Sequence, residues 1–240
     1  MAIFVPATLV KGGLTRDLSF RLPSTWQEVQ LSDRICLSIL TGDEDLISIS
    51  IIDQSFARYR HLIAPEQMTQ IGHLLQSHIT LASATYPLPD AVDSRLEPKF
   101  DKGTLRQLIE IDNHLQQYYR KPDIKLLTRL YRKLRGKWTG WLIRRRRLAA
   151  MTLLYTIAVS NFIHQLYRST LFRKTGEQQS DGSSFGWYAV ALQVAESGVF
   201  GDIEQVQDTR FHDIAVYLIE KQKEHDRHIR EMKRMSDRHR

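Results

Sequence analysis

The chain has 240 residues and a mass of 28.0 kDa, and it contains a single cysteine, Cys36. A chain of this length can bury one large core or two smaller ones without metals or disulfides. One cysteine excludes an internal disulfide and a cysteine-based zinc cluster, and it is typical of a reducing compartment. The N-terminal MAIFVPATLV has neither a basic segment nor a long apolar run, so the sequence predicts a cytoplasmic protein without a signal peptide.

The formal net charge of +7 is unevenly distributed along the chain. No acidic residue lies between Asp123 and Glu177, whereas thirteen basic residues lie there. The remainder of the chain is therefore net acidic. Such segregated charge should attract a polyanion, an anionic lipid surface or the acidic face of a protein, including a second copy of the chain.

The first predicted element is a short β-hairpin at the N-terminus. Gly12 and Gly13 separate two apolar segments, and a glycine pair supports the positive φ angles that a tight turn needs. Pro23 follows the hairpin. It precedes Thr25-x-x-Glu28, a capping-box pattern that predicts a short helix.

Helices dominate the next part of the chain. Ser32 is a suitable cap for a helix that ends at Gly42. The segment DLISISIIDQSF, residues 45–56, fits a strand and a buried helix equally well, and both interpretations stay open. A clearer amphipathic helix begins at Pro65.

The segment ATYPLPDAVDSRLEP contains three prolines and predicts a domain boundary. We therefore expect an N-terminal α+β region at 1–97 and a C-terminal helical domain at 98–240. In the second region, helices that begin at Thr104 and Pro122 should form a hairpin, and a long helix should run from about Arg145 to Phe172. The predicted fold class is mainly α, a helical bundle with a small N-terminal α+β or β-hairpin element.

The run LAAMTLLYTIAVSNFI is the most apolar stretch of the chain. Its sixteen residues are fewer than the roughly twenty that a membrane span needs. Thr152, Thr156 and Ser160 also draw a small polar stripe along it, which favours a helix buried in a bundle. The flanking Arg144–Arg147 would suit a positive-inside anchor, so a transmembrane helix is the alternative. We do not expect a membrane partner.

The C-terminal part predicts three further helices. One begins near Trp187, a short one is capped by Asp202, and the last begins at Phe211. From Glu220 the sequence alternates in charge and has few apolar residues, so we expect an exposed charged terminal helix.

Recognisable catalytic and metal-binding patterns are absent from the sequence. His73 and His78 are five residues apart, which places them on different helical faces, and no H-E-x-x-H motif occurs. Neither a G-x-S-x-G motif nor a glycine-rich phosphate loop is present. The acidic run Asp43–Asp45 is interpreted as a helix cap, with a cation site as the alternative. We therefore expect no catalytic residue, no metal, no cofactor and no enzymatic activity.

The most informative segment is YRKLRGKWTGWLIRRRR. Its basic side chains could contact phosphates while its two tryptophans stack on unpaired bases. It could instead bind an acidic protein surface, or the tryptophans could anchor a helix corner to the core. The candidate residues for binding a partner or a polyanion are Arg129, Arg132, Lys133, Arg135, Lys137, Trp138, Trp141, Arg144, Arg145, Arg146 and Arg147.

Three segments together resemble tail assembly proteins of long-tailed phages and related prophages. They are LPSTWQEVQLSDRICLSILTGDED, TLRQLIEIDNHLQQYYRKPDIKLLTRLYRK and GWYAVALQVAESGVFGDIEQVQDTRFHDIAVYLIEKQKEHD, and the likeness covers most of the chain. The resemblance implies a tail assembly chaperone that leaves before the virion is complete and acts in the host cytoplasm. Its implied partners are the tape measure protein and tail tube subunits, with self-association as a further possibility.

Two other functions stay open. The first is a nucleic-acid-binding protein that uses the basic segment 125–147. The second is a structural component of the virion.

Overall fold

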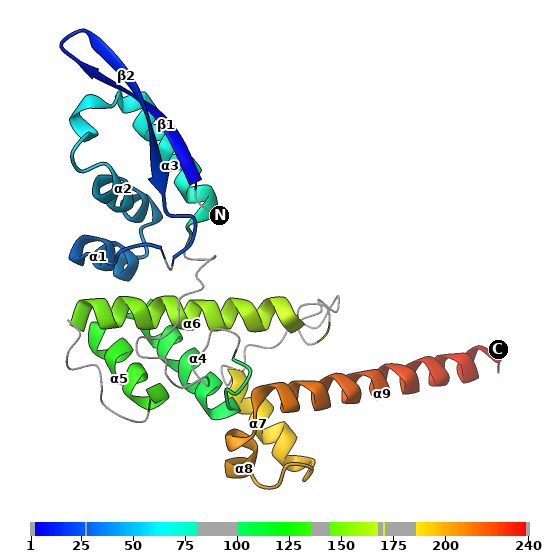
Figure 1. Ribbon diagram of the computed structural model, residues 1–240. Helices are drawn as coiled ribbons and strands as arrows, with labels where there is room; N and C mark the ends of the chain where they lie inside the picture. The colour runs from blue at the N-terminus through cyan, green and yellow to red at the C-terminus, as the bar shows by residue number, and fades with distance from the viewer. Residues whose placement is uncertain are drawn as a thin grey trace. The chain divides into compact units, whose positions relative to one another are not determined.

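The computed structural model describes residues 3–26, 28–80, 100–135, 145–167, 170 and 186–238. Within these ranges the chain forms one two-stranded antiparallel sheet and nine α-helices (Figure 1). This confirms a mainly α fold with a small N-terminal β-hairpin.

The chain forms two compact units. Unit 1 consists of residues 1–98 and 114–161, and unit 2 consists of residues 99–113 and 162–240. The expected C-terminal domain, 98–240, is thus divided between the two units. The predicted boundary segment, 84–98, lies outside the described residues.

The N-terminal hairpin pairs β1 (Ile3–Lys11) with β2 (Leu14–Leu22) in a register that runs from Ile3 opposite Leu22 to Lys11 opposite Leu14. Gly12 and Gly13 form the turn with φ angles of 56° and 82°, as the sequence predicts. Every second side chain of β1 from Val5 to Leu9 is buried. One face of the hairpin therefore belongs to the core of unit 1.

The helix predicted at Pro23–Glu28 is wrong, since the described residues of this segment form a bend and turns. The carboxylate of Glu28 accepts a hydrogen bond from the backbone N–H of Ser24 at 2.9 Å. The ring of Trp26 is buried, and its Nε1 donates to the carbonyl of Thr80 at 2.8 Å. These side-chain bonds hold a turn in place of a helix.

The first two helices of unit 1 are α1 (Asp33–Thr41) and α2 (Glu44–Ser55). Ser32 caps α1, and Gly42 ends it with a φ of 72°, both as predicted. Asp43 caps α2, because its carboxylate accepts a hydrogen bond from the N–H of Leu46 at 3.0 Å. The segment that fitted strand and helix equally is therefore a helix.

A short 3-10 turn, η1 (Arg60–Leu62), precedes α3 (Pro65–His78). Helix α3 begins at Pro65, as expected from the proline at its first position. The side chain of Gln67 accepts a hydrogen bond from the N–H of Thr8 at 3.4 Å, which joins α3 to the hairpin. Figure 1 shows α3 beside the two strands.

Three longer helices follow: α4 (Leu105–Arg120), α5 (Ile124–Arg135) and α6 (Arg145–Tyr167). Helix α6 begins at Arg145, as predicted, and the expected end of the helix at about Phe172 lies outside the described residues. The apolar middle of α6 is buried, including Thr152 and Thr156. In the described part of the chain, none of the helices combines the length and the apolar character that a membrane crossing requires.

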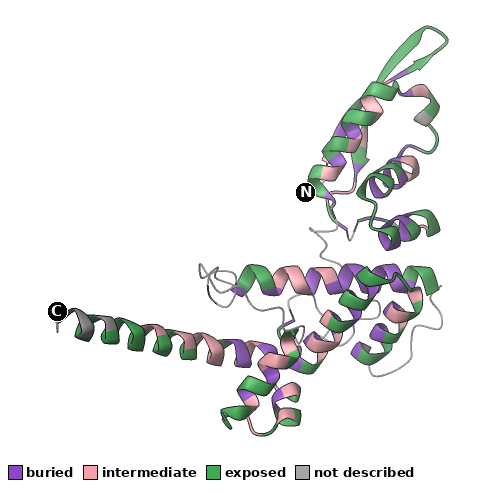
Figure 2. Cartoon of the chain, turned by 180° about the vertical axis from the view of Figure 1, so that it is seen from behind, coloured by how far each residue is buried: buried purple, intermediate pink, exposed green. Residues whose placement is uncertain are grey.

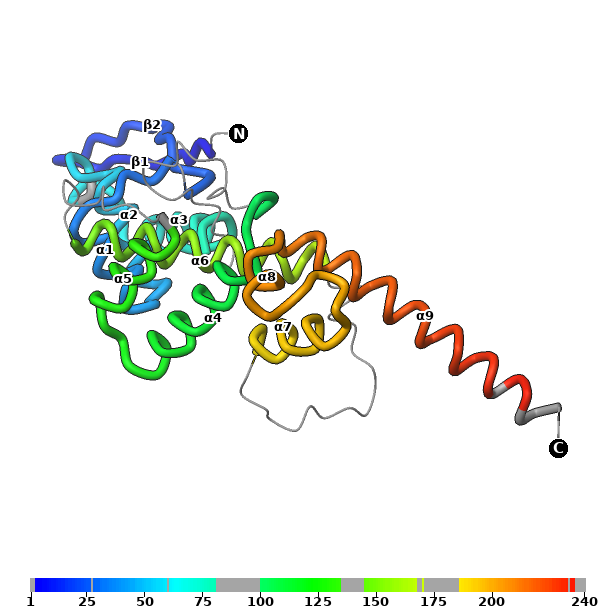
Figure 3. Tube along the Cα trace, turned by 90° about the horizontal axis from the view of Figure 1, so that it is seen from below, coloured from blue at the N-terminus to red at the C-terminus, as the bar shows by residue number. Residues whose placement is uncertain are grey.

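Unit 2 contains α7 (Gly186–Glu196), α8 (Ile203–Asp208) and α9 (Phe211–Arg238), and Figure 3 shows α7 and α8 beside the start of α9. Aromatic rings form part of its core: the rings of Tyr167 and Trp187 meet the buried ring of Phe211 edge to face. The first turns of α9 bury Phe211, Ile214 and Ala215, and most of its C-terminal half is exposed (Figure 2).

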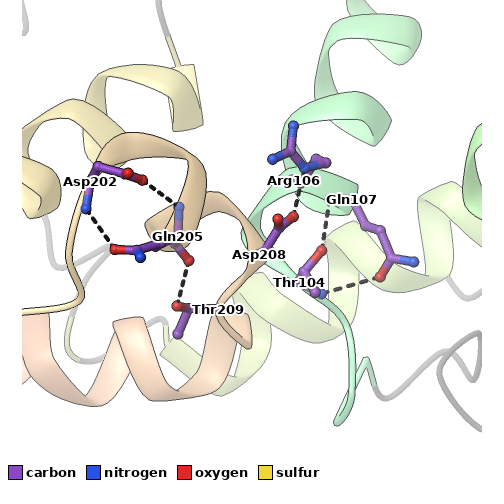
Figure 4. A network of polar contacts seen from close by, with 7 residues as sticks. All are labelled: Thr104, Arg106, Gln107, Asp202, Gln205, Asp208 and Thr209. Atoms are coloured by element: carbon purple, nitrogen blue, oxygen red, sulfur yellow. Dashed lines mark hydrogen bonds and ion pairs between the residues drawn. The ribbon is translucent and has the colours of Figure 1, made fainter.

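Short hydrogen bonds and an ion pair hold the two ends of α8 in place (Figure 4). Asp202 and Gln205 form a complete capping box at the start of α8, with bonds of 2.9 and 3.1 Å. At the end of α8, the carboxylate of Asp208 accepts a bond from Nε of Arg106 at 2.7 Å. The cap at Asp202 is as predicted, whereas no local pattern indicates the contact between Arg106 and Asp208.

Candidate functional site: a basic pocket and an apolar groove

A basic pocket of about 490 Å³ lies where α5 and α6 begin, within unit 1. Helix α5 and the residue before it line one side, and the first turn of α6 lines the other. The basic side chains of the pocket are Lys125, Arg129, Arg132, Arg145 and Arg146.

The helical period explains why these side chains share a pocket. Lys125, Arg129 and Arg132 follow at spacings of four and three, which places them along one face of α5. The opposite face carries buried residues such as Leu127 and Leu130. The basic face is therefore held in place by an apolar face that packs into the core.

The electrostatics of the pocket are strongly one-sided. Among the described residues that line it, Asp123 is the one acid. Its carboxylate accepts a hydrogen bond from the backbone N–H of Lys125 at 2.8 Å, which makes it a local cap of α5. The first turns of α5 and α6 both line the pocket, and the N-terminal end of a helix carries a partial positive charge. The basic side chains thus favour an anionic ligand, whereas the carboxylate of Asp123 already occupies the N-terminal end of α5.

The structure brings together four of the predicted site residues: Arg129, Arg132, Arg145 and Arg146. Lys133 and Arg147 are exposed on the same two helices, but they are outside the set that lines the pocket. Lys137, Trp138, Trp141 and Arg144 lie outside the described residues, as does the side chain of Arg135. The candidate residues inferred from the sequence do not include Lys125, although the basic segment 125–147 begins at it and its spacing from Arg129 could have identified it.

A second feature of unit 1 is an apolar groove of about 360 Å³ between α2 and α3. Its apolar lining includes Ile49, Ile52 and Met68, and Gly72 contributes no side chain on the α3 side. Ile49 is 41% exposed, which is unusual for an isoleucine beside a core. Sequence reasoning missed this groove, because its walls come from two helices whose packing no local pattern indicates.

Polar contacts accompany the apolar lining of the groove. The carboxylate of Asp45, one of the lining residues, accepts a hydrogen bond from Nε2 of Gln76 at 2.6 Å. Asp53, another lining residue, pairs with Arg34 at 2.7 Å. Because Gln76 is uncharged, it leaves the negative charge of Asp45 beside the apolar lining. The groove therefore suits an apolar segment with a basic residue next to it.

The chemistry of Cys36 is that of a core residue. The thiol is buried, and burial raises its pKa from 9.0 to about 11. A thiol with this pKa stays protonated at neutral pH and is a poor nucleophile. Among the described residues, no group of histidine, cysteine and carboxylate side chains is arranged to hold a metal ion.

No family model, curated protein or solved structure matches the chain.

Proposed function

We propose that this chain is a tail assembly chaperone of a long-tailed phage or prophage, and that the groove between α2 and α3 holds a helix of the tape measure protein. The observation that carries the proposal is the exposed apolar lining of this groove, which includes Ile49. The tape measure protein is proposed as the client because of the sequence resemblance to tail assembly proteins. Tail tube subunits and further copies of the chain are additional partners in the same proposal, and the site of action is the host cytoplasm.

The dimensions of the groove fit a client helix. Asp45 and Asp53 are eight residues apart on α2, which corresponds to about 12 Å, or slightly more than two helical turns. A helix that inserts its apolar side chains into a groove between two helices is a common mode of recognition. Two turns provide two or three apolar anchors on one face of the client. Each anchor would cover surface that this chain leaves exposed.

Co-expression of the chain with its tape measure protein tests the proposal. The tape measure protein should stay in the soluble fraction when the chain is present and should precipitate without it. Ile49→Asp places a charge in the groove and should abolish the effect. Leu46→Asp is the matched control, because Leu46 lies on the same helix, is 42% exposed and is outside the groove lining. It should leave the client soluble.

The proposal fails if the tape measure protein precipitates to the same extent with and without the chain. If Ile49→Asp and Leu46→Asp have the same effect on the solubility of the tape measure protein, the groove is not the binding site. Circular dichroism of both variants checks that each one is folded. Mass spectrometry of purified particles separates a chaperone, which should be absent from them, from a structural virion component, which should be present.

A further inference from the structure

We propose that the basic pocket between α5 and α6 is a binding site for the phosphate groups of single-stranded nucleic acid. The inference goes beyond the chaperone role and does not depend on it, because the pocket and the apolar groove share no lining residue. The site would allow one chain to hold a protein client and a nucleic acid strand.

The composition of the pocket indicates the chemistry of its ligand. Four of its five basic residues are arginines, and the planar guanidinium group presents several N–H donors that match phosphate oxygens. Lys125 adds a compact ammonium charge at the first turn of α5. Phosphate and carboxylate groups both accept such bonds on more than one oxygen, so the composition indicates an anion of one of these two kinds.

The shape of the pocket favours a strand over an acidic protein face. Its volume of about 490 Å³ lies within the range of sites that enclose a small molecule, roughly 300–1,000 Å³. A nucleotide unit can enter a concavity of this size and bring its phosphate to the arginines. Ile124 and Thr128 also line the pocket and give the sugar and base a less polar wall. A broad acidic surface would contact exposed cations without needing a concave site.

The charge distribution along the chain supports the same ligand. The pocket lies at the start of the stretch without acidic residues between Asp123 and Glu177. Cations gathered in one place repel one another in the empty protein, and an anionic ligand relieves that repulsion.

Fluorescence anisotropy of a labelled short oligothymidylate tests the inference. The wild-type chain should bind it, and the affinity should fall steeply with added salt. The double variant Arg129→Gln/Arg146→Gln removes one pocket cation from each helix. It should weaken binding by about tenfold or more. The slope of log affinity against log salt should also become shallower, by about 1 for each phosphate that the variant no longer binds.

The matched control is Lys133→Gln/Arg147→Gln. It removes the same number of charges from the same two helices, outside the pocket lining. The control should retain clearly more affinity than Arg129→Gln/Arg146→Gln if the pocket binds the strand, because the side chains it changes do not line the pocket. An oligoadenylate should behave like the oligothymidylate, since phosphate contacts carry no base information.

Three results would overturn the inference. The first is equal weakening by the two double variants, which would indicate diffuse attraction to the basic surface. The second is binding of polyglutamate with no binding of either oligonucleotide, which would indicate an acidic protein partner. The third is no binding of any polyanion at low salt. Both double variants should still keep the tape measure protein soluble, so failure here is distinguishable from failure of the chaperone role.

Discussion

Replacing Tyr155 by phenylalanine should stabilise the protein, whereas the same replacement at Tyr118 should destabilise it. Both tyrosines are buried in unit 1, with exposed fractions of 0% and 4%. The hydroxyl of Tyr118 donates a hydrogen bond of 2.5 Å to the carbonyl of Leu40, in the last turn of α1. The hydroxyl of Tyr155 has no hydrogen-bond partner among the described residues. Each replacement therefore removes a hydroxyl group, which is hydrogen-bonded at Tyr118 and has no partner among the described residues at Tyr155.

The magnitudes follow from these contacts. A buried polar group without a partner costs about 1–3 kcal/mol, and Tyr155→Phe removes that cost. Burial raises the pKa of the Tyr155 hydroxyl, because the ionised form would be poorly solvated there. Tyr118→Phe removes a hydrogen bond worth about 0.5–1.5 kcal/mol and leaves the Leu40 carbonyl without its donor, so the loss of stability should reach about 1–3 kcal/mol.

Urea denaturation followed by circular dichroism measures both changes. The midpoint should rise for Tyr155→Phe and fall for Tyr118→Phe, with no change in the slope. In thermal denaturation, each kcal/mol corresponds to about 2–4 °C for a chain of this size. A loss of stability in both variants would refute the reasoning, because it would show that the Tyr155 hydroxyl makes a favourable contact.

Three further changes have expected outcomes that urea denaturation can measure. Asp202→Ala should cost about 1 kcal/mol, because it removes the capping bond to Gln205, and Asp202→Ser should retain most of the stability. Gly103→Ala should cost about 1–3 kcal/mol, because the added carbon would overlap the buried ring of Phe100. Because Cys36 has a raised pKa, the folded chain keeps a proton that the unfolded chain loses, so stability should fall as the pH rises from about 9 to about 11. Cys36→Ala should remove that part of the pH dependence.

Local signals in the sequence predicted most of the elements. The glycine pair at the hairpin turn and the caps at Ser32 and Asp202 act over three or four residues, so the sequence alone contains them. The capping-box pattern at Thr25–Glu28 predicted a helix that does not form, because the side chains of this segment make other hydrogen bonds. The N–H of Ser24 bonds to Glu28, and Trp26 is anchored to Thr80. A contact across 54 residues cannot be read from a local pattern.

The candidate site could be predicted from the sequence only as far as local patterns define it. Clustered arginines in the sequence identified the basic region, and the helical period could have added Lys125. Separating the cations that line the pocket, such as Arg146, from those outside it, such as Arg147, requires the relative orientation of α5 and α6. The apolar groove depends in the same way on how α2 packs against α3. Such packing is set by side chains distant in the sequence.

The last helix has a consequence for how a partner would bind. From Glu220 to Arg238, α9 contains none of the buried residues of the described core, and local ion pairs such as Lys223 with Glu220 at 2.7 Å lie along it. A helical segment that buries few side chains gains little stability from packing, which supplies most of the stability of helices in proteins. Ile229, Met232 and Met235 are exposed along it at three-residue spacing. A protein that covered these side chains would make this helix more rigid as it bound, and part of the binding energy would be spent on that ordering.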